Sequence, residues 1–276
     1  MAIKITYREV GTHGPLLMLL HGYGGSVLHW DEMVEDLSRH FRVIIPNLSH
    51  LYMSSDKLLF TVQIEVLAEF IRTHYHNEKI NLMGTSFGGA IAWGLALQHP
   101  QLVQEIFFVN PLIPDPIPHF IVNEIRYFFR LPLTEKATQV LFATPIGKIF
   151  LRKIAQIFRD ERAEGKLALE SLSGRKLQFL ASMVANLVWI VRSEDWTHWW
   201  GRLNSLPVKN TFIFDKDDAL FGPDTYRSFA AHLGSERIVE LNGAGHLAIK
   251  TRPRLISNIV LEQLTEQNEK TKKEAA

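Results

Sequence analysis

Six short apolar runs, each rich in β-branched or aromatic residues, recur along the chain with longer segments between them. The runs are Leu16–Leu20, Val43–Ile45, Ile80–Met83, Ile106–Val109, Phe212–Phe214 and Ile238–Leu241. Runs of this length and composition are typical of buried strands, whereas Val62–Tyr75 repeats its apolar residues at helical spacing. Strands that alternate with helices predict an α/β fold, in which helices cover both faces of a doubly wound, mostly parallel sheet.

The alternation of strands and helices fails between about Pro111 and Leu206. Prolines at positions 111, 114, 116 and 118 open this stretch, and helix-like segments without a clear strand follow. Proline interrupts both strands and helices, so a change of architecture is expected there. We therefore predict an α/β core formed by residues 1–112 and 206–262. Residues 113–205 would form a helical cap inserted between the two sheet halves and folded over the carboxyl edge.

The ends of the chain predict a further strand and a charged tail. The segment Met1–Tyr7 alternates apolar and polar residues like a strand and lacks the plan of a signal peptide, which favours a cytoplasmic protein. No apolar run reaches the roughly 18 residues that a membrane-spanning helix needs. Residues 263–276 are strongly charged, so we expect a C-terminal tail that frays after a final helix.

Composition excludes several classes of function. The chain has no cysteine, which excludes disulfides, thiolate catalysis and cysteine-ligated metals. Thirty basic and 29 acidic residues leave no overall field that would attract nucleic acid. Hydrophobic residues make up 46% of the 276 positions, enough for a large core without metals or disulfides. We expect no cofactor and no metal.

The segment Gly84-Thr85-Ser86-Phe87-Gly88 follows the run Ile80–Met83 directly and precedes a helix-like stretch. It matches the pattern G-x-S-x-G in the strand–turn–helix context that gives this motif its meaning. In such a turn the backbone of the serine is strained, and the glycines let neighbouring chain approach closely. Ser86 is therefore the candidate nucleophile. The alternative is an ordinary glycine-rich turn between a strand and a helix.

The run Leu16–Leu20 ends in His21-Gly22-Tyr23-Gly24-Gly25, a loop expected to turn back over the candidate nucleophile. Acyl transfer to a serine needs two N–H donors that face the developing oxyanion. The candidates for this oxyanion hole are the backbone N–H groups of Tyr23 and Phe87. His21 is expected to bond the local backbone rather than to act as a base.

A serine hydroxyl also needs a base, and twelve histidines compete for that role. His246 ends the segment Asn242-Gly243-Ala244-Gly245-His246, right after the run Ile238–Leu241. Its glycines allow a tight loop that presents the imidazole at the sheet edge, so His246 is the candidate base. Histidines within or at the end of predicted helices are typical of the surface; these are His74, His76 and His99.

The residue that orients the base should be a carboxylate after the run Phe212–Phe214, where Asp215, Asp217 and Asp218 follow. Such a carboxylate holds the tautomer of the imidazole and stabilises the imidazolium that forms. Position alone leaves all three aspartates open. The resulting chain order of serine, aspartate and histidine differs from the orders of chymotrypsin and subtilisin.

The whole chain resembles the α/β-hydrolase fold superfamily, in its capped branch of serine esterases and lipases. The resemblance rests on the loop at 21–25, GTSFGG at 84–89, the acid loop at 215–218 and GAGH at 243–246. It implies a catalytic triad of Ser86, Asp218 and His246.

In the family the acid loop usually reads Gly-x-x-Asp, with the last aspartate catalytic. Asp215 replaces the glycine here, which keeps Asp215 and Asp217 as alternatives to Asp218. The family loop Asp-Leu-Pro-Gly-His-Gly-x-Ser is replaced by Asn-Leu-Ser-His-Leu-Tyr-Met-Ser at 47–54, and these bulkier residues should reshape one pocket wall. The serine at 86 argues against the related haloalkane dehalogenases and epoxide hydrolases, which have aspartate there.

The predicted cap carries two aromatic and aliphatic faces, over residues 121–129 and 149–158. They either pack on the core or line an apolar ligand pocket. His198 and the tryptophans around it either line that pocket or fill the cap. Basic residues beside the second face either are solvated or contact an anionic membrane surface; these are Lys148, Arg152, Lys153, Arg159 and Arg162.

Together these features predict a serine hydrolase that cleaves a small carboxylic ester, with an apolar acyl or alcohol part, through an acyl-enzyme. Three alternatives remain: a C–C-bond hydrolase of the same fold, an acyltransferase, and a non-catalytic member that binds a ligand. Neither nucleic acid nor any particular oligomeric state is predicted.

Overall fold

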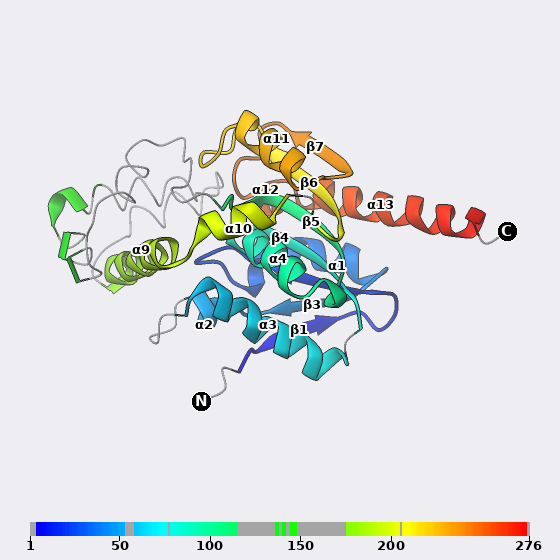
Figure 1. Ribbon diagram of the computed structural model, residues 1–276, viewed down its shortest axis with the longest axis horizontal. Helices are drawn as coiled ribbons and strands as arrows, with labels where there is room; N and C mark the ends of the chain where they lie inside the picture. Colours follow the sequence, from blue (N-terminus) through cyan, green and yellow to red (C-terminus); the bar gives the residue numbers. More distant parts are fainter. Residues whose placement is uncertain are drawn as a thin grey trace.

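Seven strands form one sheet in the order β1-β3-β2-β4-β5-β6-β7 (Figure 1). The computed structural model describes residues 4–52, 58–76, 78–114, 136–137, 140–141, 144–147, 149, 175–204 and 206–274. The strands are β1 (Tyr7–Val10), β2 (Leu16–Leu20), β3 (Arg42–Pro46), β4 (Ile80–Ser86), β5 (Val103–Pro111), β6 (Lys209–Asp215) and β7 (Arg237–Leu241). Only β1 pairs antiparallel with its neighbour, so the predicted mostly parallel α/β sheet is confirmed.

The strand predicted over Met1–Tyr7 lies further along the chain than expected. Strand β1 begins at Tyr7, whose partner in the register is Pro46, the last residue of β3. Proline has no backbone N–H and β3 ends there, so the ladder does not continue toward Lys4. A single bond from Asn47 N–H to the carbonyl of Thr6 (2.8 Å) follows it.

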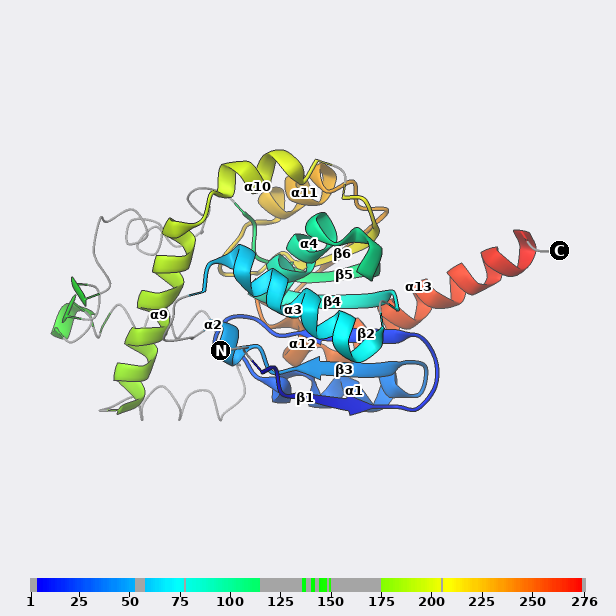
Figure 2. The ribbon, with the colours of Figure 1, turned by 60° about the horizontal axis from the view of Figure 1, so that its bottom comes forward.

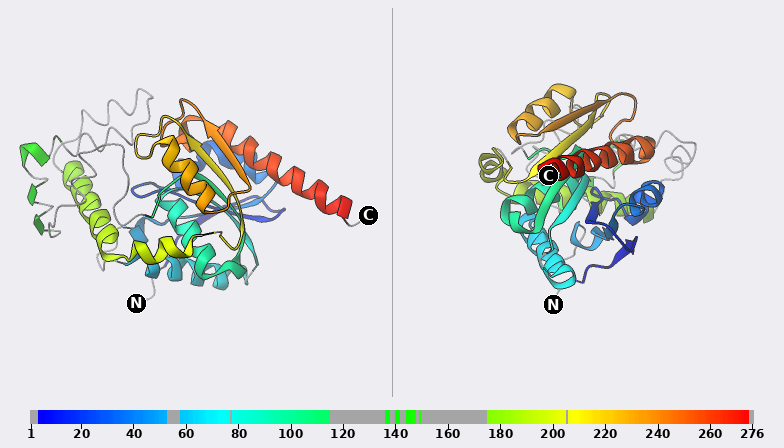
Figure 3. Two further views of the ribbon diagram at one scale, coloured as in Figure 1. Left: turned by 45° about the horizontal axis from the view of Figure 1, so that its top comes forward. Right: turned by 90° about the vertical axis from the view of Figure 1, so that its right-hand side faces the viewer.

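Helices cover both faces of the sheet. They are α1 (Asp31–Ser38), α2 (Ser49–Tyr52), α3 (Phe60–Tyr75), α4 (Phe87–Gln98), α9 (Arg175–Ser193), α10 (Trp196–Arg202), α11 (Pro223–His232), α12 (Ala248–Thr251) and α13 (Pro253–Glu274), with 3-10 turns η1 (Val27–Trp30) and η2 (Pro100–Leu102). Buried residues of α3, α4, α10 and α11 form one core, and those of α1, α12 and α13 form the other. In the right-hand view of Figure 3 the sheet separates α3 and α4 from α1 and α13.

Strand β2 shows why a continuous apolar run predicts a buried strand. Leu16, Met18 and Leu20 point into one core, while Leu17 and Leu19 point into the other. Alternate side chains of a strand face opposite sides, so a strand covered on both faces has no polar positions. All five residues of β2 are fully buried.

Between β5 and β6 the described part of the insertion is helical, as predicted, and contains α9 and α10. Helix α9 stands across the edge of the sheet at which the parallel strands end (Figure 2). The predicted faces at 121–129 and 149–158 lie outside the described residues, apart from Ile149, which is exposed, and so do the basic positions from 148 to 162. The boundaries of a cap at 113 and 205 therefore stay a prediction.

Helix α13 runs to Glu274 and extends beyond the body of the molecule (Figure 1). It includes residues that the sequence assigns to a fraying tail. Residues 263–274 contain neither glycine nor proline, and most of them are good helix formers, which lets the helix continue. Among the helices that the structure describes, none combines the length and the apolar composition needed to cross a membrane.

Candidate active site

Ser86 occupies a strained turn between β4 and α4. Its backbone has φ 52° and ψ −124°, a conformation that residues with a side chain rarely adopt. Glycines flank it because backbone lies close by: a Cβ on Gly84 would come within 2.5 Å of the Gly88 carbonyl oxygen, and one on Gly88 within 2.0 Å of the Leu20 oxygen. The residue is only 9% exposed. The strand, sharp turn and helix predicted at this motif are all present.

The loop after β2 lies directly against Ser86. A Cβ on Gly22 would stand 3.0 Å from the Cβ of Ser86, which is a tight contact, and 3.5 Å from its Oγ. The Gly25 N–H donates to the Gly22 carbonyl (3.0 Å), which closes a turn around Tyr23. The sheet register explains why this loop lies against Ser86, because Leu20 at the end of β2 pairs with Gly84 on the neighbouring strand β4.

His21 is fully buried, and both of its ring nitrogens contact the backbone. Nε2 accepts from the Leu48 N–H (3.0 Å), so Nδ1 carries the proton and donates to the Gly22 carbonyl (2.9 Å). Burial lowers the pKa of His21, which favours this neutral form. The ring thus bonds the local backbone, as the sequence predicts, and it holds the loop that faces Ser86.

Tyr23 connects that loop to helix α9. Its hydroxyl donates to the Met183 carbonyl (3.0 Å) and accepts from the Asn186 amide (3.1 Å). The same amide of Asn186 donates to the carbonyl of Tyr52, whose ring stacks on that of Tyr23. Burial raises the pKa of Tyr23, so its hydroxyl stays protonated as a donor. No sequence motif singles out Asn186 or Met183.

The replaced loop at 47–54 contains helix α2, which brings Tyr52 to the site, while residues 53–54 lie outside the described residues. The Tyr52 ring meets the Phe87 ring edge-on with centroids 4.9 Å apart, and its hydroxyl donates to the His21 carbonyl (2.8 Å). Phe87 also contacts Tyr23 edge-on at 5.7 Å. The surroundings of the Ser86 turn are therefore largely aromatic on this side.

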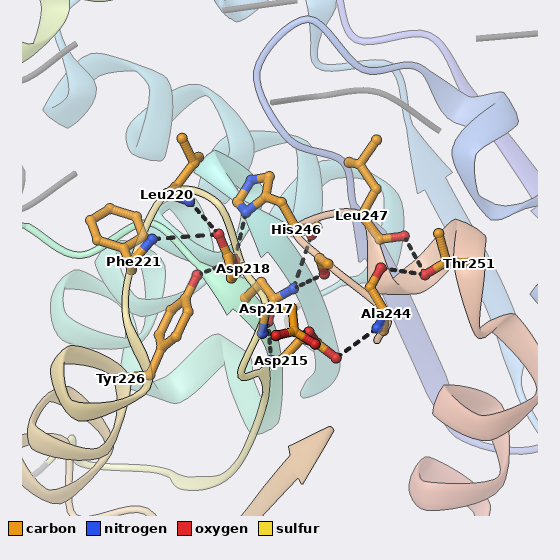
Figure 4. A network of polar contacts seen from close by, with 12 residues as sticks. Asp215, Asp217, Asp218, Leu220, Phe221, Tyr226, Ala244, His246, Leu247 and Thr251 are labelled. Carbon is orange, nitrogen blue, oxygen red and sulfur yellow. Dashed lines mark hydrogen bonds and ion pairs between the residues drawn. The ribbon is translucent and has the colours of Figure 1, made fainter. Parts of the chain in front are cut away.

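Of the three candidate aspartates, Asp218 is the one that contacts His246. Its Oδ2 lies 2.8 Å from His246 Nδ1, and both side chains are almost fully buried (Figure 4). Its other oxygen, Oδ1, accepts from the backbone N–H groups of Leu220 (2.6 Å) and Phe221 (3.4 Å). The Tyr226 hydroxyl donates to Oδ2 as well (2.7 Å). These four donors satisfy both oxygens of the buried carboxylate.

Asp215 and Asp217 hydrogen-bond to the backbone of the loop that carries His246. Asp215 accepts from the backbone N–H groups of Asp217 and Ala244, both at 2.8 Å, and Asp217 accepts from that of Gly243 (3.0 Å). These bonds explain why Asp215 stands where the family usually has glycine: it ties the acid loop to the histidine loop. The structure therefore separates the three aspartates by what they contact.

Asn110, at the end of β5, joins the same two loops. Its amide nitrogen donates to the carbonyls of Gly245 (2.8 Å) and His246 (3.0 Å), and its Oδ1 accepts from Asp215 N–H (2.8 Å). The next residue, Pro111, pairs in register with Ser86. Asn110 thereby sets the His246 loop beside the Ser86 turn. Its backbone φ of 44° is positive, which asparagine tolerates better than most residues, and no sequence motif singles out Asn110.

Other predicted positions lie apart from this cluster. His198 is exposed on α10, and His99 lies between Arg72 and Glu65. Within the described ranges, no group of three or more histidine, aspartate or glutamate side chains is arranged to hold a metal ion.

The seven-stranded sheet thus carries a strained serine turn at the end of β4 and a buried Asp–His pair on the loops after β6 and β7. The chain matches the alpha/beta hydrolase fold family over residues 15–253 and belongs to it. By sequence it is similar to the AB hydrolase superfamily protein YfhM of Bacillus subtilis, with 29% identity over 277 residues covering 92% of this chain and 91% of the relative.

A shorter match links the chain to a pimeloyl-(acyl-carrier protein) methyl ester esterase of Vibrio vulnificus. The two are 33% identical over 96 residues, which cover 35% of this chain and 36% of the esterase. Among solved structures, a thermophilic esterase from Thermogutta terrifontis has a TM-score of 0.68 at 17% identity, covering 95% of this chain and 93% of that one. Haloalkane dehalogenase DbeA from Bradyrhizobium elkani has a TM-score of 0.71 at 20% identity, covering 95% and 94%. These structural likenesses concern the fold alone.

Proposed function

We propose that this protein is a serine hydrolase that cleaves a carboxylic ester with an apolar acyl or alcohol part. Ser86 is the nucleophile, His246 the general base and Asp218 the carboxylate that orients His246. The backbone N–H groups of Tyr23 and Phe87 form the oxyanion hole. The observation that carries the proposal is the strained Ser86 turn facing Gly22 at the same sheet edge as the buried Asp218–His246 pair.

The reaction follows from these positions. Ser86 Oγ attacks the ester carbonyl carbon while its proton moves to His246 Nε2, and the carbonyl oxygen becomes an oxyanion. Collapse of the tetrahedral intermediate expels the alcohol, which takes the proton from Nε2. Water then attacks the acyl-enzyme and gives a proton to Nε2; as the acid leaves, Nε2 returns this proton to Ser86 Oγ and both residues are restored.

Two of the three aspartates are better suited to support than to catalysis. Asp215 and Asp217 bond backbone N–H groups of the His246 loop, whereas Asp218 bonds the imidazole itself. Asp218 accepts a hydrogen bond from the Nδ1–H of His246, which leaves Nε2 free of a proton and able to receive that of Ser86. This supports Asp218 as the acid of the triad.

The choice of an ester with an apolar part rests on the surroundings of Ser86. Tyr23, Tyr52 and Phe87 stand on one side of the turn, and Met183 of α9 reaches the loop beside Gly24. Pockets lined mainly by apolar groups take apolar ligand parts. We further propose that α9 and α10 belong to a cap over this edge. The partial likeness to a methyl ester esterase agrees with ester cleavage.

A series of p-nitrophenyl esters with increasing acyl length tests the function. We expect hydrolysis of these esters, with kcat/KM rising from acetate to medium-length acyl chains. Parallel reactions with an added alcohol acceptor detect acyl transfer, and a vinylogous diketone substrate detects C–C-bond cleavage. Cleavage of the diketone without turnover of any ester would overturn the proposed ester hydrolase in favour of a C–C-bond hydrolase.

A further inference from the structure

The Tyr226 hydroxyl contacts the same oxygen of Asp218 as the imidazole of His246. The two bonds to Oδ2 measure 2.7 Å and 2.8 Å (Figure 4). Nothing in the catalytic scheme above uses Tyr226, and no sequence motif points to it. A second donor on the oxygen that orients the base has a direct electrostatic consequence for that base.

Packing fixes the position of the hydroxyl. Tyr226 is fully buried in the first turns of α11, and its ring contacts those of Phe212 (5.9 Å), Phe214 (5.3 Å) and Phe221 (5.6 Å). Its backbone N–H donates to the Gly222 carbonyl (3.1 Å). A ring held by three aromatic neighbours and by the helix cannot turn its hydroxyl away from Asp218 without disturbing the core.

The direction of the hydrogen bond is also determined. Burial and the adjacent negative charges of Asp218 and Asp215 raise the pKa of Tyr226 well above its usual value. The phenol therefore keeps its proton and donates it to the carboxylate. Titratable groups reach this cluster from four places: Asp215 from the end of β6, Asp218 from the following loop, Tyr226 from α11 and His246 from the loop after β7.

We propose that Tyr226 is a positioning residue that aims Asp218 Oδ2 at His246 and, by sharing that oxygen, weakens the bond to the imidazole. A donor on Oδ2 withdraws electron density, so the carboxylate stabilises the imidazolium less. The expected result is a base that is neutral, and thus ready to accept a proton, at a lower pH than Asp218 alone would allow. The catalytic meaning of this rests on the proposed function, but the contact itself does not.

NMR titration of His246 without substrate tests the proposal. With twelve histidines, His246 is assigned in protein carrying nitrogen-15 histidine by the signal that His246→Gln removes. In Tyr226→Phe the ring packing stays and the hydroxyl is lost, so the titration midpoint of His246 should rise by about half a pH unit or more. The Nδ1 proton signal should move downfield because its hydrogen bond strengthens.

Tyr75→Phe is the matched control. Tyr75 lies on α3, apart from the site, and its hydroxyl also donates to a carboxylate, that of Glu9 on β1 (3.3 Å). The substitution removes this hydroxyl. The His246 titration should not change in this variant. A merely structural role of Tyr226 would lower the thermal stability and leave the titration unmoved, which would overturn the proposal.

A second substitution should shift the His246 titration midpoint in the opposite direction, which keeps the test valid if Tyr226→Phe fails to fold. Site-specific 3-fluorotyrosine at position 226 keeps the ring and gives a more acidic phenol, which is a stronger donor. The His246 midpoint should then fall below that of the unmodified protein. An unchanged or raised midpoint with fluorotyrosine would also overturn the proposal. Because no substrate is present, an inactive protein would contradict the proposed function alone.

Discussion

His246 Nδ1 and Asp218 Oδ2 lie 2.8 Å apart between side chains that are 1% and 0% exposed. The two residues come from loops that follow neighbouring parallel strands, β6 and β7. Water has almost no access to this pair, so the carboxylate acts on the imidazole at low dielectric, where a charge-assisted hydrogen bond is strong. The relationship gives the three aspartates of the acid loop different expected roles in turnover.

Asp218→Asn should lower ester turnover by about a thousandfold or more, because the amide no longer holds the correct imidazole tautomer. Asp215→Asn and Asp217→Asn should lower turnover by less than about tenfold, because they weaken only bonds to backbone N–H groups and none to the imidazole. The measurement is kcat for the three purified variants, with unfolding temperatures as the control for folding. A severe loss at Asp215 alone would transfer the role of the acid to that residue.

The pH dependence of turnover distinguishes the two buried histidines near Ser86. We expect kcat/KM to rise through one ionisation between about pH 5.5 and 7.5, where histidine side chains ordinarily titrate, and then to level off. His246→Ala should remove both the activity and this rise. His21→Ala should keep the shape of the profile, because both His21 nitrogens already contact backbone groups. A profile that His21→Ala erases and His246→Ala preserves would reverse the two roles.

The contact between α9 and the oxyanion loop predicts a remote effect on catalysis. Asn186→Leu removes the amide that bonds both the Tyr23 hydroxyl and the Tyr52 carbonyl. A looser loop should lower kcat by about fivefold, the equivalent of one hydrogen bond of about 1 kcal/mol. Ser182→Ala, on an exposed position of the same helix, is the control and should keep the wild-type kcat. An unchanged kcat in Asn186→Leu would mean that α9 does not support this loop.

Acid should destabilise the protein partly through His29. Burial, with smaller effects from Lys250 and His21, lowers the pKa of His29 from 6.5 to about 4. Between these values the unfolded chain binds a proton that the folded state does not, so the free energy of unfolding falls as the pH drops through this window. Urea unfolding should show that the free energy of unfolding falls less between about pH 7 and pH 4.5 in His29→Gln than in wild type.

The control for that experiment is His198→Gln, because His198 is exposed on α10. This variant should show the same acid-induced drop as wild type. A drop of wild-type size in His29→Gln would exclude His29 as a source of the acid sensitivity.

Most of the fold could be predicted from the sequence because the signals are local. Strand β2 matches its predicted range residue for residue, since burial on both faces leaves five apolar residues in a row. Ser86 and His246 stand out in the sequence as candidates because glycines surround each of them in a strand–turn context. The first strand was predicted too early in the chain, because its start depends on where its partner β3 ends. The alternation of apolar and polar residues in Met1–Tyr7 carries no information about that partner.

The residues that support the site could not be predicted, because their contacts join distant parts of the chain. Asn110 bonds the loop of His246, and Asn186 bonds Tyr23, across 136 and 163 positions respectively. Tyr226 follows Asp218 by eight positions, but its role depends on which face of α11 meets the acid loop. Only the tertiary structure assigns these polar side chains their partners.

Covalent labelling by a fluorophosphonate probe tests the central claim most directly, since such a probe reacts with an activated serine. Wild-type protein should be labelled at Ser86, as located by mass spectrometry, and Ser86→Ala should be unlabelled while ester turnover falls by about a thousandfold or more. Ser257→Ala, which removes another buried serine hydroxyl on α13, should be labelled like wild type. Labelling and turnover that persist in Ser86→Ala would contradict the assignment of Ser86 as the nucleophile.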